Sequence, residues 1–134
     1  MKKIIIIDDD KINQDILSTA FNQKGYNVLS VFDSRQCIEE IGKYKPDLIL
    51  LDLLMPGLNG FEVLQIMKRE SIIPKIPVIV LTALKEEVNI KKSLALGAKD
   101  YWLKTDYNPS QLVEKINGLL EERSSDGEEK RKSI

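Results

Sequence analysis

Short apolar runs alternate five times with longer segments in which apolar residues recur every three or four positions. The runs predict β-strands, and several are apolar at every position, as is typical of strands that helices cover on both faces. The predicted strands are Lys3–Ile7, Val28–Phe32, Asp47–Leu51, Val78–Leu81 and Tyr101–Leu103. Because strands that alternate with helices form parallel sheets, we predict an α/β fold with a doubly wound, five-stranded parallel sheet and helices on both faces.

Two of the helical segments differ in the strength of their apolar stripes. The first ends before Gly25, and its predicted core-facing residues are Ile12, Ile16, Leu17, Ala20 and Phe21. The fourth, about Glu86–Leu96, has a thin stripe of Val88, Leu94 and Ala95. We therefore expect the fourth helix to be weakly anchored and to be the part of the domain that moves.

Capping residues mark the starts of two further helices. Asp33 and Gln36 predict a capping box that opens the second helix, and Asn59 and Glu62 predict another that opens the third. Asp10 is expected to cap the first helix.

The fifth helix is specified by Asn108 as the N-cap and Gln111 three positions later, and it is predicted to end near Arg123. The residues that follow are polar and charged, with too few apolar side chains to fold alone. We therefore predict a globular domain at residues 1–123 and a charged flexible tail, or the start of a linker, at residues 124–134.

Composition restricts the chemistry available to this chain. It has 134 residues, one cysteine (Cys37) and no histidine, which excludes serine–histidine triads, a phosphohistidine-carrier role and most zinc sites. The net charge of −1, with acids and bases interspersed, predicts no direct nucleic-acid or membrane partner. A lone cysteine, with no apolar stretch long enough for a membrane span or signal peptide, favours a cytoplasmic location.

Chemically useful side chains follow four of the predicted strands. Asp8 and Asp9 come after the first, Asp52 after the third, Thr82 at the end of the fourth and Lys104 after the fifth. In open α/β sheets, ligands bind outside the carboxyl ends of the strands. The sequence therefore predicts one pocket that contains all five side chains.

This set of residues suits a phosphoryl group. Carboxylate oxygens are the ligands that Mg²⁺ prefers, so Asp9 and Asp52 are expected to bind it directly and Asp8 through water, with Mn²⁺ as an alternative cation. Lys104 can neutralise phosphoryl oxygens, and the Thr82 hydroxyl can donate a hydrogen bond to one of them. Asp52 is then the expected nucleophile, which would form an aspartyl phosphate.

From the acids after Lys3–Ile7 to the motifs around Asp52, Thr82 and Lys104, the chain resembles the receiver domain of bacterial two-component response regulators, in particular stand-alone chemotaxis-type ones. The resemblance spans about Lys2 to Glu122. It implies a flavodoxin-like fold with strand order 2-1-3-4-5 and a signalling switch that catalyses its own phosphorylation and dephosphorylation rather than a turnover enzyme.

The resemblance also implies roles for particular residues. Asp52 would accept phosphate from a histidine kinase or a histidine phosphotransfer protein, and the backbone carbonyl of Leu54 would join Asp8, Asp9 and Asp52 around the metal. Thr82 and Lys104 would bind the phosphoryl group, and Thr82 and Tyr101 would act as the switch. The face built from the fourth helix, fifth strand and fifth helix would then bind a downstream effector protein or a second copy of the chain.

Two alternatives stay open at this point. One is a degenerate receiver that binds partners without phosphorylation, because Thr105 follows Lys104 where the family usually has a proline after a cis peptide bond. If that bond is trans, Lys104 is expected to approach from a changed angle, with Asp106 competing for its charge. The other alternative is a haloacid dehalogenase-type phosphohydrolase with Asp8 as nucleophile, although Lys11 stands where that family has threonine or valine.

Overall fold

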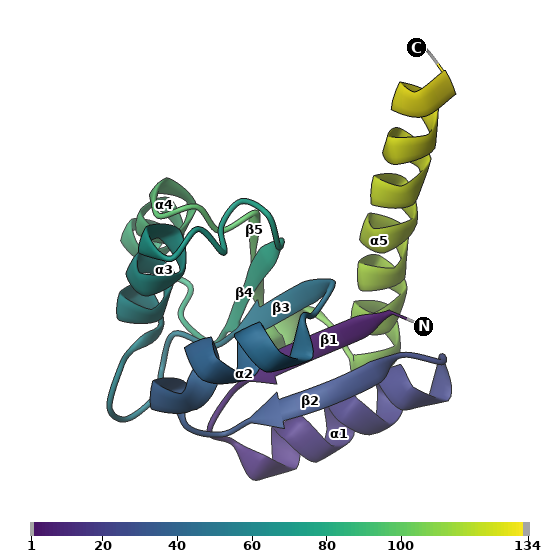
Figure 1. Cartoon of the computed structure of the whole chain (residues 1–134). Helices are drawn as coiled ribbons and strands as arrows, with labels where there is room; N and C mark the ends of the chain where they lie inside the picture. Colours follow the sequence, from purple (N-terminus) through teal and green to yellow (C-terminus); the bar gives the residue numbers. More distant parts are fainter. Residues whose placement is uncertain (1, 133–134) are drawn as a thin grey trace.

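The computed structural model describes residues 2–132, and the side chains of residues 2–121. Its five strands are β1 (Lys3–Ile7), β2 (Asn27–Val31), β3 (Leu48–Leu51), β4 (Val78–Thr82) and β5 (Asp100–Leu103). All neighbouring strands are parallel, in the order β2-β1-β3-β4-β5 (Figure 1). The predicted fold class and strand order are confirmed, and each predicted strand boundary lies within one residue of the observed one.

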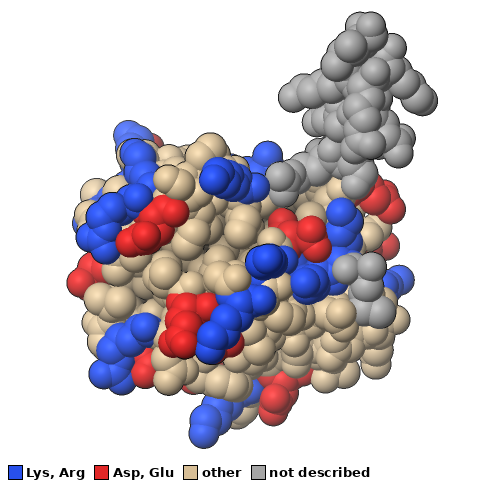
Figure 2. Space-filling model, viewed as in Figure 1, with Lys and Arg blue, Asp and Glu red and all other residues tan. Residues whose placement is uncertain are grey.

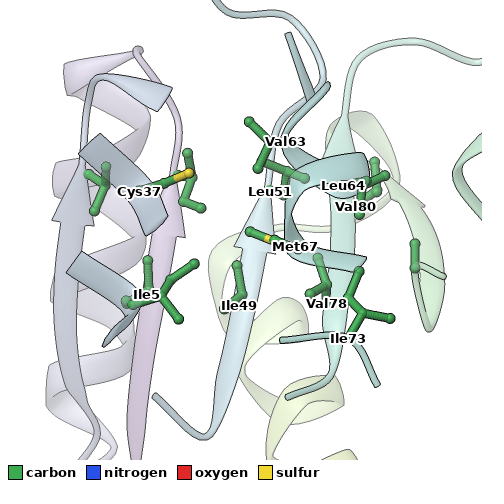
Figure 3. Packing of buried hydrophobic residues seen from close by; sticks show 14 of the residues in the cluster. Ile5, Cys37, Ile49, Leu51, Val63, Leu64, Met67, Ile73, Val78 and Val80 are labelled. Carbon is green, nitrogen blue, oxygen red and sulfur yellow. The ribbon is translucent and has the colours of Figure 1, made fainter. Parts of the chain in front are cut away.

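Helices cover both faces of this sheet. The helices are α1 (Lys11–Gln23), α2 (Cys37–Tyr44), α3 (Gly60–Arg69), α4 (Glu87–Ala95) and α5 (Pro109–Lys132), and two short 3-10 turns span Ser34–Gln36 and Lys104–Asp106. Alternate residues of the strands point to opposite faces. Ile4 and Ile6 therefore pack with α1 and α5, whereas Ile5 and Ile7 pack with α2 and α3. Figure 3 shows part of the second cluster, in which Leu64 and Met67 of α3 lie over β3 and β4. This double burial is why the strands are apolar at consecutive positions.

The predicted buried stripe of α1 is partly wrong. Ile12 is 73% exposed and Ile16 is 48% exposed, and the buried positions are Gln14, Leu17 and Phe21. At about 100° per residue, the buried positions share one side of the helix, and Ile12 and Ile16 fall on the opposite side. The spacing of apolar residues was helical, but the sequence allowed two stripes, and the sheet packs against the one that contains a glutamine.

The predicted stripe of α4 is also wrong. Val88 is 70% exposed, Leu94 is 45% exposed and Ala95 is exposed, while Ser93 is the buried residue of this helix. The Ser93 hydroxyl donates a hydrogen bond to the Asn89 carbonyl, which satisfies it inside the helix. The fully buried residue of this helix is therefore small and polar, while Ile90 is half-buried and Val88 and Leu94 are exposed.

The helix caps agree with the sequence except at Asp33. Asp10 caps α1, and Asn59 and Glu62 form the predicted capping box of α3. The Asp33 side chain instead accepts from the backbone amide of Arg35 and begins a 3-10 turn. The α2 helix starts only after that turn, at Cys37.

The fifth helix is longer than predicted. Asn108 and Gln111 exchange hydrogen bonds between side chain and backbone at its start, as expected for a capping box. The helix continues to Lys132, so its predicted end near Arg123 is wrong. The flexible tail or linker start at residues 124–134 stays a prediction, and residues 133–134 lie outside the described part. Glu, Lys and Arg, which are frequent in this part of the sequence, have favourable helix propensities. The domain boundary at residue 123 stays a prediction. Within the described residues, no helix has the length and apolar character needed to cross a membrane.

Candidate functional site

Three of the predicted site residues meet at the carboxyl edge of the sheet. Asp8 follows β1, Asp52 follows the adjacent β3, and Lys104 follows β5. The Lys104 Nζ lies 2.8 Å from Oδ2 of Asp8 and 3.0 Å from Oδ2 of Asp52. One ammonium group therefore pairs with two carboxylates that follow two different strands.

Both carboxylates are nearly inaccessible to solvent and are satisfied by specific donors. Asp8 is 2% exposed, and it accepts from the Asp10 amide at 3.0 Å and from Nδ2 of Asn13 at 2.9 Å, in addition to Lys104. Asp52 is 6% exposed and accepts from the Leu54 amide at 3.2 Å. Burying a carboxylate without such partners is costly, so these contacts keep two anions stable beside each other.

Lys104 is held as a cation by its two partners. Partial burial by itself lowers the pKa of an ammonium group, but the hydrogen bonds and charges of Asp8 and Asp52 outweigh it, and the pKa of Lys104 is raised. In the described chain the cis peptide bond is Ile73–Pro74, so Lys104–Thr105 is trans. The expected competition from Asp106 is not observed, because the ion pairs of Lys104 are to Asp8 and Asp52.

The acidic cluster has a composition that suits a hard cation. One carboxylate oxygen each from Asp8, Asp9 and Asp52 lies within 4.8 Å of the others, and Asp9 is the exposed member. Oxygen-only ligands favour Mg²⁺ or Mn²⁺ over metals that prefer nitrogen or sulfur. The three residues could therefore hold a metal ion. The Leu54 peptide borders the site through its amide, and a ligand role for its carbonyl stays a prediction.

Thr82 and Tyr101 are connected through the loop that follows β4. Thr82 is fully buried, and its Oγ1 accepts from the Leu84 amide at 3.5 Å. The Tyr101 hydroxyl donates to the Leu84 carbonyl at 2.5 Å, and burial is the main cause that raises the pKa of Tyr101. Among the described residues, Thr82 forms no hydrogen bond with Asp8 or Asp52. The predicted switch residues are thus linked to each other more directly than to the acids.

Asn13 and Gln14 were not predicted to belong to the site. Asn13 binds Asp8, and Gln14 is fully buried, with Nε2 2.7 Å from the Ile6 carbonyl, 3.1 Å from that of Asp8 and 3.2 Å from that of Val31. These hydrogen bonds connect the ends of β1 and β2 to α1, next to the position of Asp8. Polar residues on an amphipathic helix normally face solvent, so the sequence pattern did not predict that Asn13 and Gln14 support the site. The available signal was that Gln14 shares a helix face with Leu17 and Phe21.

Comparisons with known proteins agree with this arrangement. Residues 4–117 match the model of the response regulator receiver domain family. The phosphate regulon transcriptional regulatory protein PhoB of Pseudomonas aeruginosa is 37% identical over 119 residues, which are 89% of this chain and 52% of that protein. The DNA-binding response regulator MtrA of Mycolicibacterium paratuberculosis is 30% identical over 89% of this chain and 51% of that protein. The chain thus spans about half the length of these curated relatives.

The alignments with solved receiver structures cover nearly the full length of both chains. A CheY-like response regulator receiver domain protein from Methanospirillum hungatei JF-1 has a TM-score of 0.84 and 29% identity, covering 94% of this chain and 98% of that one. The receiver domain of the Francisella response regulator 1452 has a TM-score of 0.82 and 29% identity, covering 92% and 99%. These matches give no support to the haloacid dehalogenase alternative. The chain therefore belongs to the response regulator receiver domain family.

Proposed function

We propose that this domain accepts a phosphoryl group on Asp52 from the phosphohistidine of a sensor histidine kinase or a histidine phosphotransfer protein. The observation that carries the proposal is the position of Lys104, whose ammonium group contacts the nearly buried carboxylates of both Asp52 and Asp8. This is the charge arrangement expected of a site built to receive a dianionic phosphoryl group.

The proposed reaction is a direct displacement at phosphorus. An Oδ of Asp52 attacks the phosphorus atom, an O–P bond forms, and the P–N bond to the donor imidazole breaks with its electron pair staying on nitrogen. Lys104, whose ammonium group contacts two carboxylates, would redirect part of its hydrogen bonding to the incoming phosphoryl oxygens. The hydroxyl of Thr82 would donate a hydrogen bond to another of these oxygens.

Asp8, Asp9 and Asp52, with the Leu54 carbonyl, are the residues that would hold Mg²⁺, or Mn²⁺ in its place. The support is the all-oxygen cluster within 4.8 Å. When bound, the cation supplies positive charge that offsets charge on the phosphoryl oxygens. Asn13 and the Asp10 amide would keep Asp8 oriented toward the cluster.

The proposed output is a population shift on the face formed by α4, β5 and α5. If Thr82 turns toward a phosphoryl group, the Leu84 amide loses its acceptor, and the Leu84 carbonyl is the group that Tyr101 binds. Exposed Val88 and Leu94 on α4 offer apolar area for a downstream effector protein or a second copy.

The proposal includes no direct contact with nucleic acid. In the view of Figure 2, basic and acidic side chains are interspersed rather than gathered into a basic patch. DNA binding is stated in the name of MtrA, of which the matched part of this chain covers 51%, and the absence of a nucleic-acid partner here stays a prediction. The cytoplasmic location likewise stays a prediction.

The test is incubation with acetyl phosphate and Mg²⁺, followed by intact mass and peptide mapping. We expect one added phosphate on Asp52, which is lost in Asp52→Asn, slowed in Asp8→Asn and unchanged in Asp15→Asn, a control that removes an exposed acid of α1. Phosphate on Asp8 would instead support the hydrolase reaction. No adduct in a folded, Mg²⁺-binding protein would support the degenerate receiver.

A further inference from the structure

The loop that carries Lys104 is held at its far end by an aromatic and cationic contact. After the 3-10 turn Lys104–Asp106, the Tyr107 ring packs against Trp102, with centroids 5.8 Å apart and planes tilted by 52°. Lys115 of α5 lies above both rings, with its Nζ 4.8 Å from each centroid. The same Nζ donates a hydrogen bond of 2.7 Å to the Tyr107 hydroxyl.

Trp102 is a firmly buried partner for Tyr107. It is 4% exposed, belongs to β5 and packs in the core formed with α1 and α5. The Tyr107 ring therefore packs against the buried Trp102 ring, and its hydroxyl is bound by Lys115 of α5. Since Lys104 lies between Trp102 and Tyr107 in the chain, its backbone is fixed at both sides.

The space beside the loop explains why such a fixing contact matters. A partly open surface pocket of about 210 Å³ is lined by both Lys104 and Tyr107, together with Ile16 and Leu17 of α1. A loop beside such a pocket can shift into it without first displacing packed side chains. The peptide after Lys104 is trans, and Thr105 lacks the fixed φ of a proline. The backbone of the loop is therefore less restricted than it would be with a proline at position 105.

We propose that Tyr107 and Lys115 are positioning residues for Lys104, which hold its loop so that the ammonium group stays between Asp8 and Asp52. This inference rests on the proposed function, because it assigns the contact a role in phosphoryl transfer. Among the described residues, the contacts of Lys115 and the Tyr107 ring are with each other and with Trp102, not with the acids. Their effect passes through the backbone of residues 104–107.

The experiment measures the rate of Asp52 phosphorylation by acetyl phosphate in the full chain. Tyr107→Ala and Lys115→Met are expected to slow it by about threefold to tenfold, because a cation–π contact and a charged hydrogen bond are lost. Lys115→Arg, which can still donate and stack, is expected to restore most of the rate. Lys3→Met removes a similar contact, with Nζ 5.4 Å from the Tyr44 ring at the opposite edge of the sheet, and should leave the rate unchanged.

A double-mutant cycle separates positioning from general destabilisation. If Tyr107 acts through Lys104, then adding Tyr107→Ala to Lys104→Ala produces no further slowing. Equal slowing in both backgrounds, or no slowing by Tyr107→Ala alone, would overturn the inference while leaving the proposed function intact. If Lys104→Ala itself phosphorylates at the wild-type rate, the role of Lys104 in the proposed function fails first.

Discussion

The β3–α3 and β4–α4 segments each consist of a strand, a loop and a helix, but they differ in how firmly the loop and the helix are held. After β3, the Leu54 amide holds Asp52, the Gly60 amide donates to the Leu53 carbonyl at 3.1 Å, and α3 begins with a complete capping box. The helix then buries Val63, Leu64 and Met67. The acid that we propose as phosphoryl acceptor is therefore supported by a fixed segment.

The β4–α4 segment has much weaker support. Thr82 is bound by the Leu84 amide at 3.5 Å, α4 has no side-chain cap, and the buried residue of this helix is Ser93. Few buried apolar contacts mean a low free energy of local opening. The difference indicates that the acceptor side of the site is set in advance, whereas the side that carries Thr82 can rearrange at small cost.

The largest expected effect comes from one substitution made in both helices. Leu64→Ala in α3 should lower the free energy of unfolding by about 2–5 kcal/mol, because it leaves a cavity at a fully buried position. Leu94→Ala in α4, where the side chain is 45% exposed, should change it by no more than about 0.5 kcal/mol. Urea unfolding measures both, and similar losses would break the comparison.

A second, smaller effect tests how closely the loop after Asp52 is packed. A Cβ at Gly60 would lie 2.6 Å from the Leu53 Cα and 2.8 Å from the Asp52 carbonyl oxygen, so the backbone beside Asp52 must move. We expect Gly60→Ala to destabilise the domain by about 1–3 kcal/mol and to slow phosphorylation. Gly118→Ala in α5 meets no atom within 4 Å and should stabilise by about 0.5–1 kcal/mol. A neutral Gly60→Ala in unfolding and phosphorylation assays would show that this loop is not closely packed.

The smallest expected effect concerns Tyr101 and pH. Burial, with the nearby charges of Glu86 and Asp52, raises the pKa of Tyr101 above the ordinary tyrosine value of 10.0. The unfolded chain therefore releases this proton at lower pH than the folded domain, so the contribution is fully present below about pH 10 and is lost as pH rises through the folded pKa. Tyr101→Phe should cost about 0.5–1.5 kcal/mol at neutral pH and make the alkaline loss of stability shallower. Unfolding curves of both proteins at several pH values above and below 10 provide the measurement, and parallel alkaline losses would contradict it.

The sequence predicted the carboxyl-edge residues because their signal is local. Asp8, Asp52 and Thr82 each follow or end an apolar strand, and parallel strands bring such positions to one edge of the sheet. Lys104 follows the same logic, and the structure places it against two of the acids. The catalytic roles assigned to these residues stay predictions.

The exposed stripes of α1 and α4 show what local spacing does not specify. Helical spacing identified both helices, but the face that packs on the sheet depends on how each helix is rotated by the chain before and after it. Gln14 lies inward because three strand-end carbonyls accept from its amide, and Ile12 lies outward as a consequence.

The sequence by itself determined the class of fold, the strand order through a family resemblance, and the edge of the sheet where the acids gather. These follow from apolar periodicity and from residues that adjoin strands. Only the tertiary structure decided that one lysine pairs with both Asp8 and Asp52, that Asn13 and Gln14 support the site, and that Lys115 binds Tyr107 beside the lysine loop. Such contacts join segments far apart in the chain, and they arise from packing geometry, which no local pattern encodes.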